Sequence, residues 1–277
     1  NSRVAVTRTR AGLQDVFTAS GHVGKMAFPT RIYRSVSDAD QYAGSVLKAF
    51  IEKEGIQVSR GVRVERTPRK DLGRPLASVE GFPLSWQLLG LFKVSNNFIG
   101  DMMTIQLDFD ETKKYGATLE GGAAQLESYM SNILQAAPAP YKSSAEGLVL
   151  DSGSGLTHSN KLSARDVVAV LHRMYQNSRE FPAFLNALPM PGAEGTVKKR
   201  FSSEQTKHLR DRLRAKTGTL SEPHDAIGLA GYSRLKDGDW VAFCAIVNGS
   251  SKRPNVGIET ARDTIDDDLG RLLPPEM

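Results

Sequence analysis

The sequence of 277 residues predicts an α+β fold, because helical and strand-like segments follow one another in separate blocks. Segments with apolar residues at helical spacing dominate from residue 37 to residue 175. Two apolar runs, 226–235 and 240–247, come later and are joined by a Lys-Asp-Gly-Asp turn, which is a strong hairpin signal. A last helical segment, 258–273, follows them. We therefore expect an antiparallel sheet with helices packed against it.

The expected helices have recognisable ends. Residues 37–55 begin with Ser-Asp-Ala-Asp, a sequence similar to a capping box with Ser37 as the cap, and end at a glycine. Residues 121–134 and 163–175 have the same periodicity, and Ser163 is the expected cap of the second segment. Three prolines and a glycine between residues 182 and 192 predict a loop.

The segment 84–107 has helical spacing but is interrupted by Ser95-Asn96-Asn97. Serine and asparagine are poor helix formers, because their side chains compete for backbone hydrogen bonds. The interruption therefore predicts a break in the helix. Residues 56–65 alternate with a period of two and predict one bulged strand or two short strands, and residues 1–30 predict strands and loops.

The charge of the chain indicates no nucleic-acid partner. There are 36 Lys and Arg residues against 31 Asp and Glu residues, and this excess of five gives only a weak field. The basic residues are scattered in short groups, and no basic strand carries aromatic residues that could stack on bases. The single Cys244 excludes an intrachain disulfide, and no apolar run approaches the roughly 18 residues of a membrane-spanning helix.

Metal and nucleotide sites have no basis in the sequence. The histidines form no HxxxH or HxxE pair and have no cysteine cluster beside them. They are His22, His158, His172, His208 and His224. Neither GxGxxG after a strand nor the P-loop sequence GxxxxGKS or GxxxxGKT occurs. We therefore expect no metal ion and no organic cofactor.

The tripeptide Lys216-Thr217-Gly218 opens the strand expected before the hairpin. A lysine supplies positive charge, a threonine hydroxyl can bind a substrate carboxylate, and glycine lets a bound peptide approach the strand edge. Upstream, the Ser95 hydroxyl can relay a proton and the Asn97 amide can hold a substrate amide. An S-x-N element at a helical connection, combined with K-T-G on an edge strand, is the combination found in active-serine penicillin-recognising enzymes.

A purely structural interpretation of the same residues is also open at this point. Ser95 and Asn97 belong to the residue types that cap helices. A lysine at the position of Lys216 can serve to discourage aggregation at a strand edge.

Taken in order, these elements resemble the D-alanyl-D-alanine carboxypeptidase/endopeptidase family, the class C low-molecular-mass penicillin-binding proteins. The resemblance runs from about Tyr33 to Asn248. The segments that carry it keep the family's order and are 42–48, 92–97, 151–160, 188–196, 215–220 and 229–232. Two departures are Thr157, where the family often has serine, and Glu222-Pro223-His224, which looks like extra length after the K-T-G strand.

The resemblance implies the transpeptidase-like fold of penicillin-binding proteins and β-lactamases, with the N-terminal part of the domain missing. It implies a serine peptidase that acts through an acyl-enzyme on D-Ala-D-Ala termini or cross-links of peptidoglycan, and that β-lactams acylate. It implies no cofactor. Because this substrate lies outside the cytoplasmic membrane, we expect a periplasmic or extracytoplasmic protein.

The resemblance also assigns roles to the matched residues. Ser95 passes a proton to the departing amine, and Asn97 orients the substrate amide. Lys216 polarises Ser95 and attracts the terminal carboxylate. Thr217-Gly218-Thr219 binds substrate: Thr217 holds the carboxylate, and the Thr219 backbone N–H completes the oxyanion hole.

The nucleophile of the family belongs to an S-x-x-K element, for which the chain offers two candidates. Ser233 and Lys236 come after K-T-G, in the wrong order. Ser45 and Lys48 precede Ser95 but fall on the polar face of their predicted helix, two turns beyond its start, where a nucleophile would be solvated. We therefore expect the nucleophile outside this chain, on a second stretch of polypeptide.

Two domains follow from this interpretation. Residues 1–30 are expected to be the tail of an inserted accessory domain, and residues 31–277 an incomplete serine DD-peptidase domain. Two other functions remain open: a family member without a nucleophile that binds peptidoglycan or a partner, and a β-lactamase-like hydrolase on the same fold.

Overall fold

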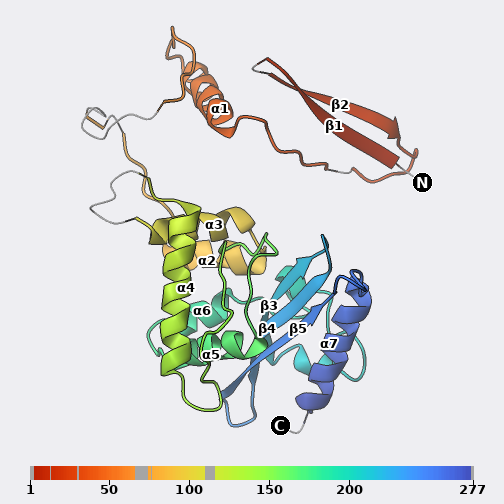
Figure 1. Cartoon of the computed structure of the whole chain (residues 1–277). Helices are drawn as coiled ribbons and strands as arrows, with labels where there is room; N and C mark the ends of the chain where they lie inside the picture. The colour runs from red at the N-terminus through yellow and green to blue at the C-terminus, as the bar shows by residue number, and fades with distance from the viewer. Residues whose placement is uncertain are drawn as a thin grey trace. The chain divides into compact units, whose positions relative to one another are not determined.

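The computed structural model describes residues 3–12, 14–29, 31–65, 74–75, 77–109 and 116–275. The contacts within the chain divide it into two compact units, Asn1–Arg74 and Pro75–Met277. Figure 1 labels the helices and strands of both units. The assignment of residues 1–30 to an accessory domain, and of residues 31–277 to a peptidase domain, stays a prediction.

A two-stranded hairpin opens the first unit. Strands β1 (Arg3–Ala11) and β2 (Gln14–His22) pair antiparallel, in a register that places Thr7 opposite Thr18. Most of their side chains are exposed on both faces. The hairpin agrees with the strands expected within residues 1–30.

Helix α1 (Ala39–Lys53) lies within the predicted helix, but its cap is one residue later than predicted. The Asp38 side chain accepts a hydrogen bond from the backbone N of Gln41 at 3.0 Å. Ser37, the expected cap, donates to Asp15 instead, at 2.7 Å from its backbone N and 2.5 Å from its Oγ. Ser37, which the local sequence predicts to cap the helix, is therefore hydrogen-bonded to the Asp15 carboxylate of the hairpin.

The strand prediction for residues 56–65 is wrong. This segment has no regular secondary structure, because no strand in the described part of the chain pairs with it. It runs close to α1, where a Cβ on Gly44 would lie 2.4 Å from the Val62 side chain. Three large apolar side chains of α1 are exposed: Tyr42, Leu47 and Phe50 are each about 60% accessible.

The helices of the second unit confirm most of the predicted segments. The predicted helical run 84–107 is two helices, α2 (Leu84–Lys93) and α3 (Asn97–Leu107), with the predicted break between them. Helix α4 (Leu119–Ala136) and helix α5 (Ala164–Tyr175) follow, and Ser163 caps α5 in a full capping box with Asp166.

One prediction between these helices and the sheet is wrong. The region expected to be a loop contains a short helix, α6 (Phe181–Ala187). Pro182 lies in its first turn, where the missing backbone N–H has no helical partner to lose and the fixed φ suits the helix.

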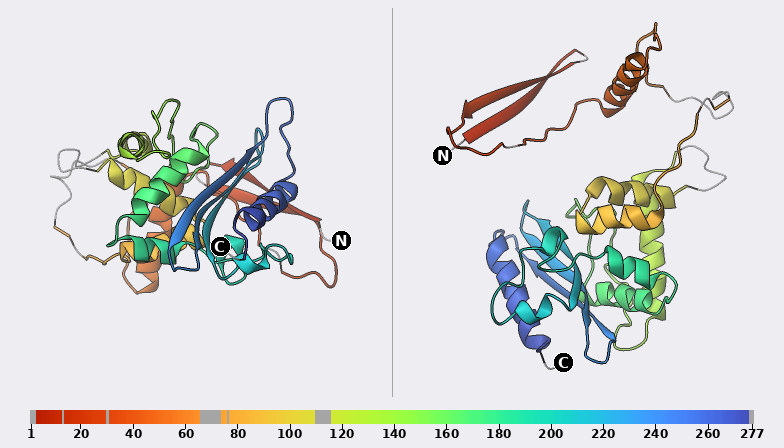
Figure 2. Two further views of the ribbon diagram at one scale, coloured as in Figure 1. Left: turned by 90° about the horizontal axis from the view of Figure 1, so that it is seen from below. Right: turned by 180° about the vertical axis from the view of Figure 1, so that it is seen from behind.

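The predicted strands and closing helix are confirmed. Strands β3 (Leu213–Leu220), β4 (Ala226–Arg234) and β5 (Trp240–Asn248) form an antiparallel sheet in that order, and helix α7 (Ile258–Leu272) ends the unit. Figure 2 shows α7 on one face of the sheet and the green helices, including α5, on the other. The α+β class is therefore confirmed.

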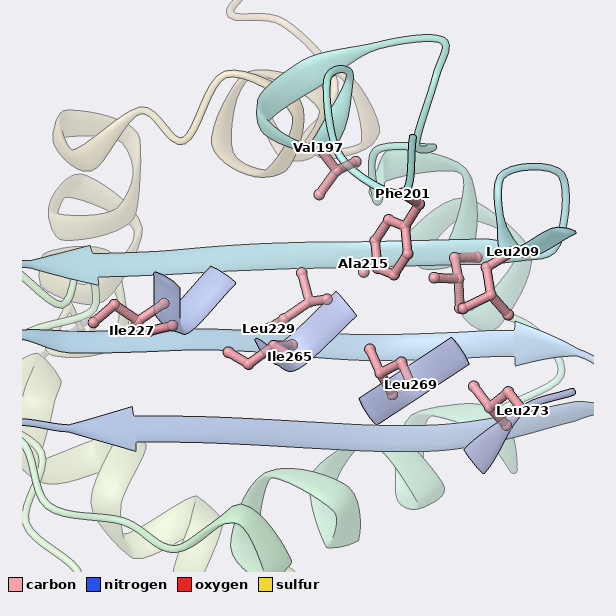
Figure 3. Close-up of a cluster of buried hydrophobic side chains, with 11 residues drawn as sticks. Val197, Phe201, Leu209, Ala215, Ile227, Leu229, Ile265, Leu269 and Leu273 are labelled. Atoms are coloured by element: carbon pink, nitrogen blue, oxygen red, sulfur yellow. The ribbon is translucent and has the colours of Figure 1, made fainter. Parts of the chain in front are cut away.

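Side chains along β4 alternate between two apolar cores. Ile227 and Leu229 point toward α7 and join the cluster drawn in Figure 3, with Ile265 and Leu269 of that helix. Tyr232 points to the opposite face and packs with Leu171 of α5 and with α6. Each face of the sheet therefore has its own helical cover, α7 on one side and α5 with α6 on the other.

Candidate functional site

The turn between α2 and α3 holds Ser95 in an unusual backbone conformation. Its φ is +57°, in the left-handed region that residues other than glycine, asparagine and aspartate rarely adopt. Such strain persists only where the surroundings impose it, and it concentrates at functional sites. Asn96, not Ser95 or Asn97, caps α3, because its side chain accepts from the Ile99 backbone N at 3.2 Å. The capping interpretation of Ser95 and Asn97 is therefore wrong.

Lys216 on β3 reaches Ser95 directly. Its Nζ donates hydrogen bonds to Ser95 Oγ at 2.6 Å and to the Thr217 carbonyl oxygen at 2.6 Å. Burial lowers the pKa of Lys216, because the charged ammonium loses solvation. A lysine that served only to protect the strand edge would extend into solvent, so this contact also argues against the structural interpretation of Lys216.

The outer edge of β3 is covered at one end and open at the other. The Ala215 backbone N donates to the Pro189 carbonyl oxygen at 3.0 Å, which closes the edge there. Backbone N–H groups alternate along a strand, so those of Thr217 and Thr219 point to the same side as that of Ala215. Apart from Gly218 itself and its two neighbours in the chain, no described residue has an atom within 4 Å of the position of a Cβ on Gly218. An extended peptide therefore has room beside Thr217, Gly218 and Thr219.

A loop from α6 to β3 joins the two motifs. Glu194 forms an ion pair with Lys93 of α2, at 2.5 Å, two residues before Ser95. The next residue, Gly195, has a φ of +66°, and a Cβ there would lie 2.7 Å from the Lys93 carbonyl oxygen. Thr196 accepts a hydrogen bond from Thr217 Oγ1 at 2.8 Å. The loop thus contacts the end of α2 and the middle of β3.

Residues 151–160 form an ordered loop beside α3. The backbone N of Ser154 donates to Asp101 Oδ1 at 3.0 Å, and Gly100 packs directly on that serine. Asn160 holds the loop closed, because its Oδ1 accepts from the Asp151 N at 2.6 Å and its Nδ2 donates to the Ser152 carbonyl oxygen at 3.1 Å. These contacts explain why this part of the sequence carries several small residues and ends in an asparagine.

The loop, the helical turn and the β3 edge line one cleft of about 1620 Å³. It contains every site residue that the sequence predicts, and these are Ser95, Asn97, Lys216, Thr217, Gly218 and Thr219. The side-chain amide of Asn97 makes no hydrogen bond with any described residue, so it is available to a ligand. One cleft thus brings together residues that lie 121 positions apart, such as Ser95 and Lys216.

Sequence reasoning gave no role to several other residues of this cleft. His158 and His224 lie with their ring centroids 5.3 Å apart, and Arg262 of α7 donates to Thr219 Oγ1 at 3.4 Å. The extra length at residues 222–224 was visible in the sequence, but nothing indicated that it would place His224 against His158. Thr196 lay within a matched segment, 188–196, without a role.

The two S-x-x-K serines of this chain, Ser45 and Ser233, belong to different units. Ser45 is exposed on α1 and donates to the Gln41 carbonyl oxygen of its own helix at 2.8 Å. Lys48 contacts the Arg60 carbonyl oxygen at 3.3 Å rather than Ser45. Ser233 is fully buried in β4, where no substrate can reach it. Ser233 does not line the cleft of its own unit.

The sequence as a whole matches the family model of the D-Ala-D-Ala carboxypeptidase 3 (S13) family over residues 2–269. This match covers nearly the entire chain. The chain belongs to the S13 family of D-Ala-D-Ala carboxypeptidases. The recognition made from the ordered S-x-N and K-T-G segments is therefore confirmed.

A curated relative has the same family activity in its name. A D-alanyl-D-alanine carboxypeptidase from an Actinomadura species is 25% identical over 253 residues, which are 89% of this chain and 44% of the relative. The chain thus spans less than half of that relative's length. No solved structure matches the chain significantly. None of the helices described for this S13 protein is long and apolar enough to cross a membrane.

Proposed function

We propose that this S13 chain supplies the proton-transfer and carboxylate-binding half of a serine DD-peptidase site. The site acts on D-Ala-D-Ala termini or D-Ala cross-links of peptidoglycan peptides, and β-lactams acylate it. The observation that carries the proposal is the hydrogen bond from Lys216 Nζ to Ser95 Oγ at 2.6 Å, inside a cleft beside an open strand edge. Family membership supports the same reaction.

The substrate peptide lies antiparallel along the open edge of β3. Thr217 and Thr219 offer backbone N–H groups on that side, and Gly218 leaves room for the peptide backbone. The Thr217 hydroxyl binds the terminal carboxylate, and Lys216 adds positive charge close by. The Asn97 amide, which has no other partner in the described residues, orients the substrate amide.

The covalent step uses a serine of an S-x-x-K element that lies outside these 277 residues, on a second stretch of polypeptide. Its hydroxyl proton passes to the lysine of the same S-x-x-K element while its oxygen attacks the carbonyl of the penultimate D-Ala, and the oxyanion receives a hydrogen bond from the Thr219 backbone N–H. Collapse of this intermediate breaks the C–N bond to the terminal residue and leaves the serine ester. The departing amine takes a proton from Ser95 Oγ. Lys216, whose pKa burial lowers, restores that proton and keeps Ser95 in place. Water then hydrolyses the acyl-enzyme.

The substrate of such a site is outside the cytoplasmic membrane, so the proposal includes an extracytoplasmic location. The position of Ser233 also supports a second candidate function, a protein that binds peptidoglycan peptides without cleaving them. Ser233, the S-x-x-K serine of the unit that contains the cleft, is buried in β4 and does not line the cleft, as expected of a non-catalytic protein that binds peptidoglycan peptides.

Labelling with a fluorescent penicillin, followed by peptide mapping in a mass spectrometer, tests the proposal. The samples are the 277-residue chain and the longest natural polypeptide that carries it. We expect label in the longer polypeptide only, on a serine outside these residues. Label on Ser45 would refute the placement of the nucleophile. No label in either folded sample would refute the acyl-enzyme and support the binding protein.

Variants of the longer polypeptide test the roles within the cleft. Lys216→Ala and Ser95→Ala should each slow acylation about 10²- to 10⁴-fold, the usual contribution of a positioned proton-transfer group. Lys236→Ala is the matched control, because Lys236 is exposed in the turn between β4 and β5 and lies outside the cleft. Unchanged acylation in both cleft variants would contradict the assigned roles.

A further inference from the structure

The loop formed by residues 189–197, here called the bridging loop, contacts both motif-bearing parts of the cleft: strand β3, which carries K-T-G, and the end of α2, next to S-x-N. Pro189 accepts the hydrogen bond from the Ala215 backbone at 3.0 Å, and Glu194 pairs with Lys93 at 2.5 Å. Val197 at the end of the loop is completely buried in the core under α7. The loop is therefore anchored on the sheet, on α2 and in the core, and it holds Thr196 in a fixed place between these anchors.

Thr196 faces the residue to which the proposed function gives the substrate carboxylate. Thr217 Oγ1 donates its proton to Thr196 Oγ1 at 2.8 Å, and both residues line the cleft. Within the described part of the chain, Thr196 Oγ1 has no other hydrogen-bond partner. In this structure the hydroxyl proton of Thr217 is directed at Thr196.

A carboxylate can only accept hydrogen bonds, so Thr217 must turn its proton from Thr196 to the ligand. Thr196 then becomes able to rotate its own hydroxyl and donate to Thr217 Oγ1, because a hydroxyl carries one donor and two acceptor positions. Hydrogen bonds in such a chain polarise one another, so the bond from Thr217 to the ligand becomes stronger. A neutral amide at the same position of the ligand, which also offers N–H donors, does not require this reversal.

We infer that Thr196 is a positioning residue for Thr217, and that the two hydroxyls form a reversible relay that favours ligands with a free terminal carboxylate. This inference rests on the proposed function, because it takes the carboxylate position from it. It adds a specificity-determining residue on an element separate from both the S-x-N and the K-T-G segments. Glu194 supports the relay indirectly, since its ion pair with Lys93 fixes the loop next to Ser95.

The decisive comparison uses two substrates: a D-Ala-D-Ala peptide with a free C-terminus and the same peptide with a C-terminal amide. The enzyme is the longest natural polypeptide that carries this sequence. Thr196→Val keeps the shape of the side chain and removes the hydroxyl. We expect kcat/KM for the free acid to fall about 3- to 10-fold, and kcat/KM for the amide to change less than twofold. Thr196→Ser should restore the wild-type ratio.

Three further variants and outcomes complete the test. Thr264→Val is the control, because this exposed threonine of α7 donates to its own helix and lies outside the cleft. Glu194→Gln should lower kcat/KM for both substrates equally, whereas Glu204→Gln, which removes an exposed ion pair with Lys207, should change neither. An equal fall for both substrates in Thr196→Val, or no fall, overturns the relay. A wild type that neither cleaves these peptides nor binds penicillin overturns the proposed function itself.

Discussion

Within each of the two units, a different kind of interaction holds the segments together. In the unit that contains the cleft, apolar side chains form three buried clusters, two of them on opposite faces of the sheet. In the first unit no described residue is buried, and polar contacts at the surface join its parts. Arg34 donates to the Val6 carbonyl oxygen at 2.8 Å, and Arg8 donates to Ser35. The difference teaches that an amphipathic sequence predicts a helix without predicting what covers it.

Helices α1 and α5 make this point directly. Both begin with a capping side chain, and both carry apolar residues at helical spacing. Leu171 of α5 packs against Tyr232 of the sheet, whereas Leu47 of α1 is 61% exposed. Similar local patterns therefore end in opposite environments. Paired substitutions, one in each unit, can measure how large the difference is.

The ion pairs should show the largest contrast. Arg200 and Asp266 are nearly buried and 2.6 Å apart, and burial raises the pKa of Asp266 even though Arg200 opposes that rise. Arg200→Met leaves this carboxylate buried without its partner, so we expect a loss of about 3–5 kcal/mol in the free energy of unfolding. Arg10→Met breaks the exposed pair with Asp38 and should change it by about 1 kcal/mol or less.

Urea unfolding followed by tryptophan fluorescence measures the first effect, because Trp86 and Trp240 both belong to the second unit. Unfolding of the first unit is followed separately, by amide hydrogen exchange. If Arg10→Met destabilised its unit as much as Arg200→Met does, the first unit would have a core that the described contacts do not show.

The apolar side chains should give the next contrast. Leu229→Ala leaves a cavity in the cluster under α7, where the leucine is 1% exposed, and should lower the free energy of unfolding by about 2–5 kcal/mol. Leu47→Ala on α1 removes an exposed side chain and should change it by less than about 0.5 kcal/mol. The same urea and exchange measurements apply. A large effect of Leu47→Ala would mean that another part of the protein covers α1.

The helix caps should differ less than the cores. Ser163→Ala removes one hydrogen bond of the capping box on α5 and should lower the stability of the second unit by about 1 kcal/mol. Asp38→Ala removes the cap of α1 and should loosen that helix without moving the tryptophan transition. Far-ultraviolet circular dichroism and amide exchange report on α1. A shift of the tryptophan midpoint by Asp38→Ala would contradict the independence of the two units.

The smallest effect concerns the pH response of the first unit. Hydrogen bonds from the Ser37 hydroxyl and backbone lower the pKa of Asp15 below its ordinary value of 3.8, with Arg8 and Arg10 adding to the effect. A lowered carboxyl pKa stabilises the folded form above pH 3.8, and this contribution disappears as the pH falls through the folded pKa. The Ser37 amide resonance should therefore titrate below pH 3.8, and Asp15→Asn should abolish that titration. Titration at or above pH 3.8 would show that the contact is absent in solution.

Much of the cleft could be predicted from the sequence, and the reasons are local. Ser95-Asn96-Asn97 interrupts a helix. Lys216-Thr217-Gly218 lies on the strand before a hairpin, and an Asp-Gly turn predicts that hairpin. Both signals depend on short-range propensity and spacing, which act within a few residues. All six predicted residues accordingly line one cleft. The placement of the nucleophilic serine outside these 277 residues stays a prediction.

Two of the wrong predictions concern interactions between segments that are far apart, whereas the missed helix α6 depends on the local effect of Pro182. Asp15 binds Ser37 across 22 positions and moves the cap of α1 to Asp38. Residues 56–65 alternate like a strand but have no strand partner in the described part of the chain. Propensity cannot anticipate either case, because the Asp15 contact and the presence or absence of a strand partner both depend on residues outside the local window.

By itself, the sequence determined all the helices except α6, the hairpin and the residue types of an S13 site, since each depends on neighbours along the chain. Only the tertiary structure decided three other features. It placed Lys216 against Ser95 across 121 positions, lowered the pKa of that lysine by burial, and made Thr196 the partner of Thr217. The physical reason is that desolvation and hydrogen-bond geometry depend on which surfaces meet. In this protein, the helices packed on both faces of the three-stranded sheet determine which surfaces come into contact.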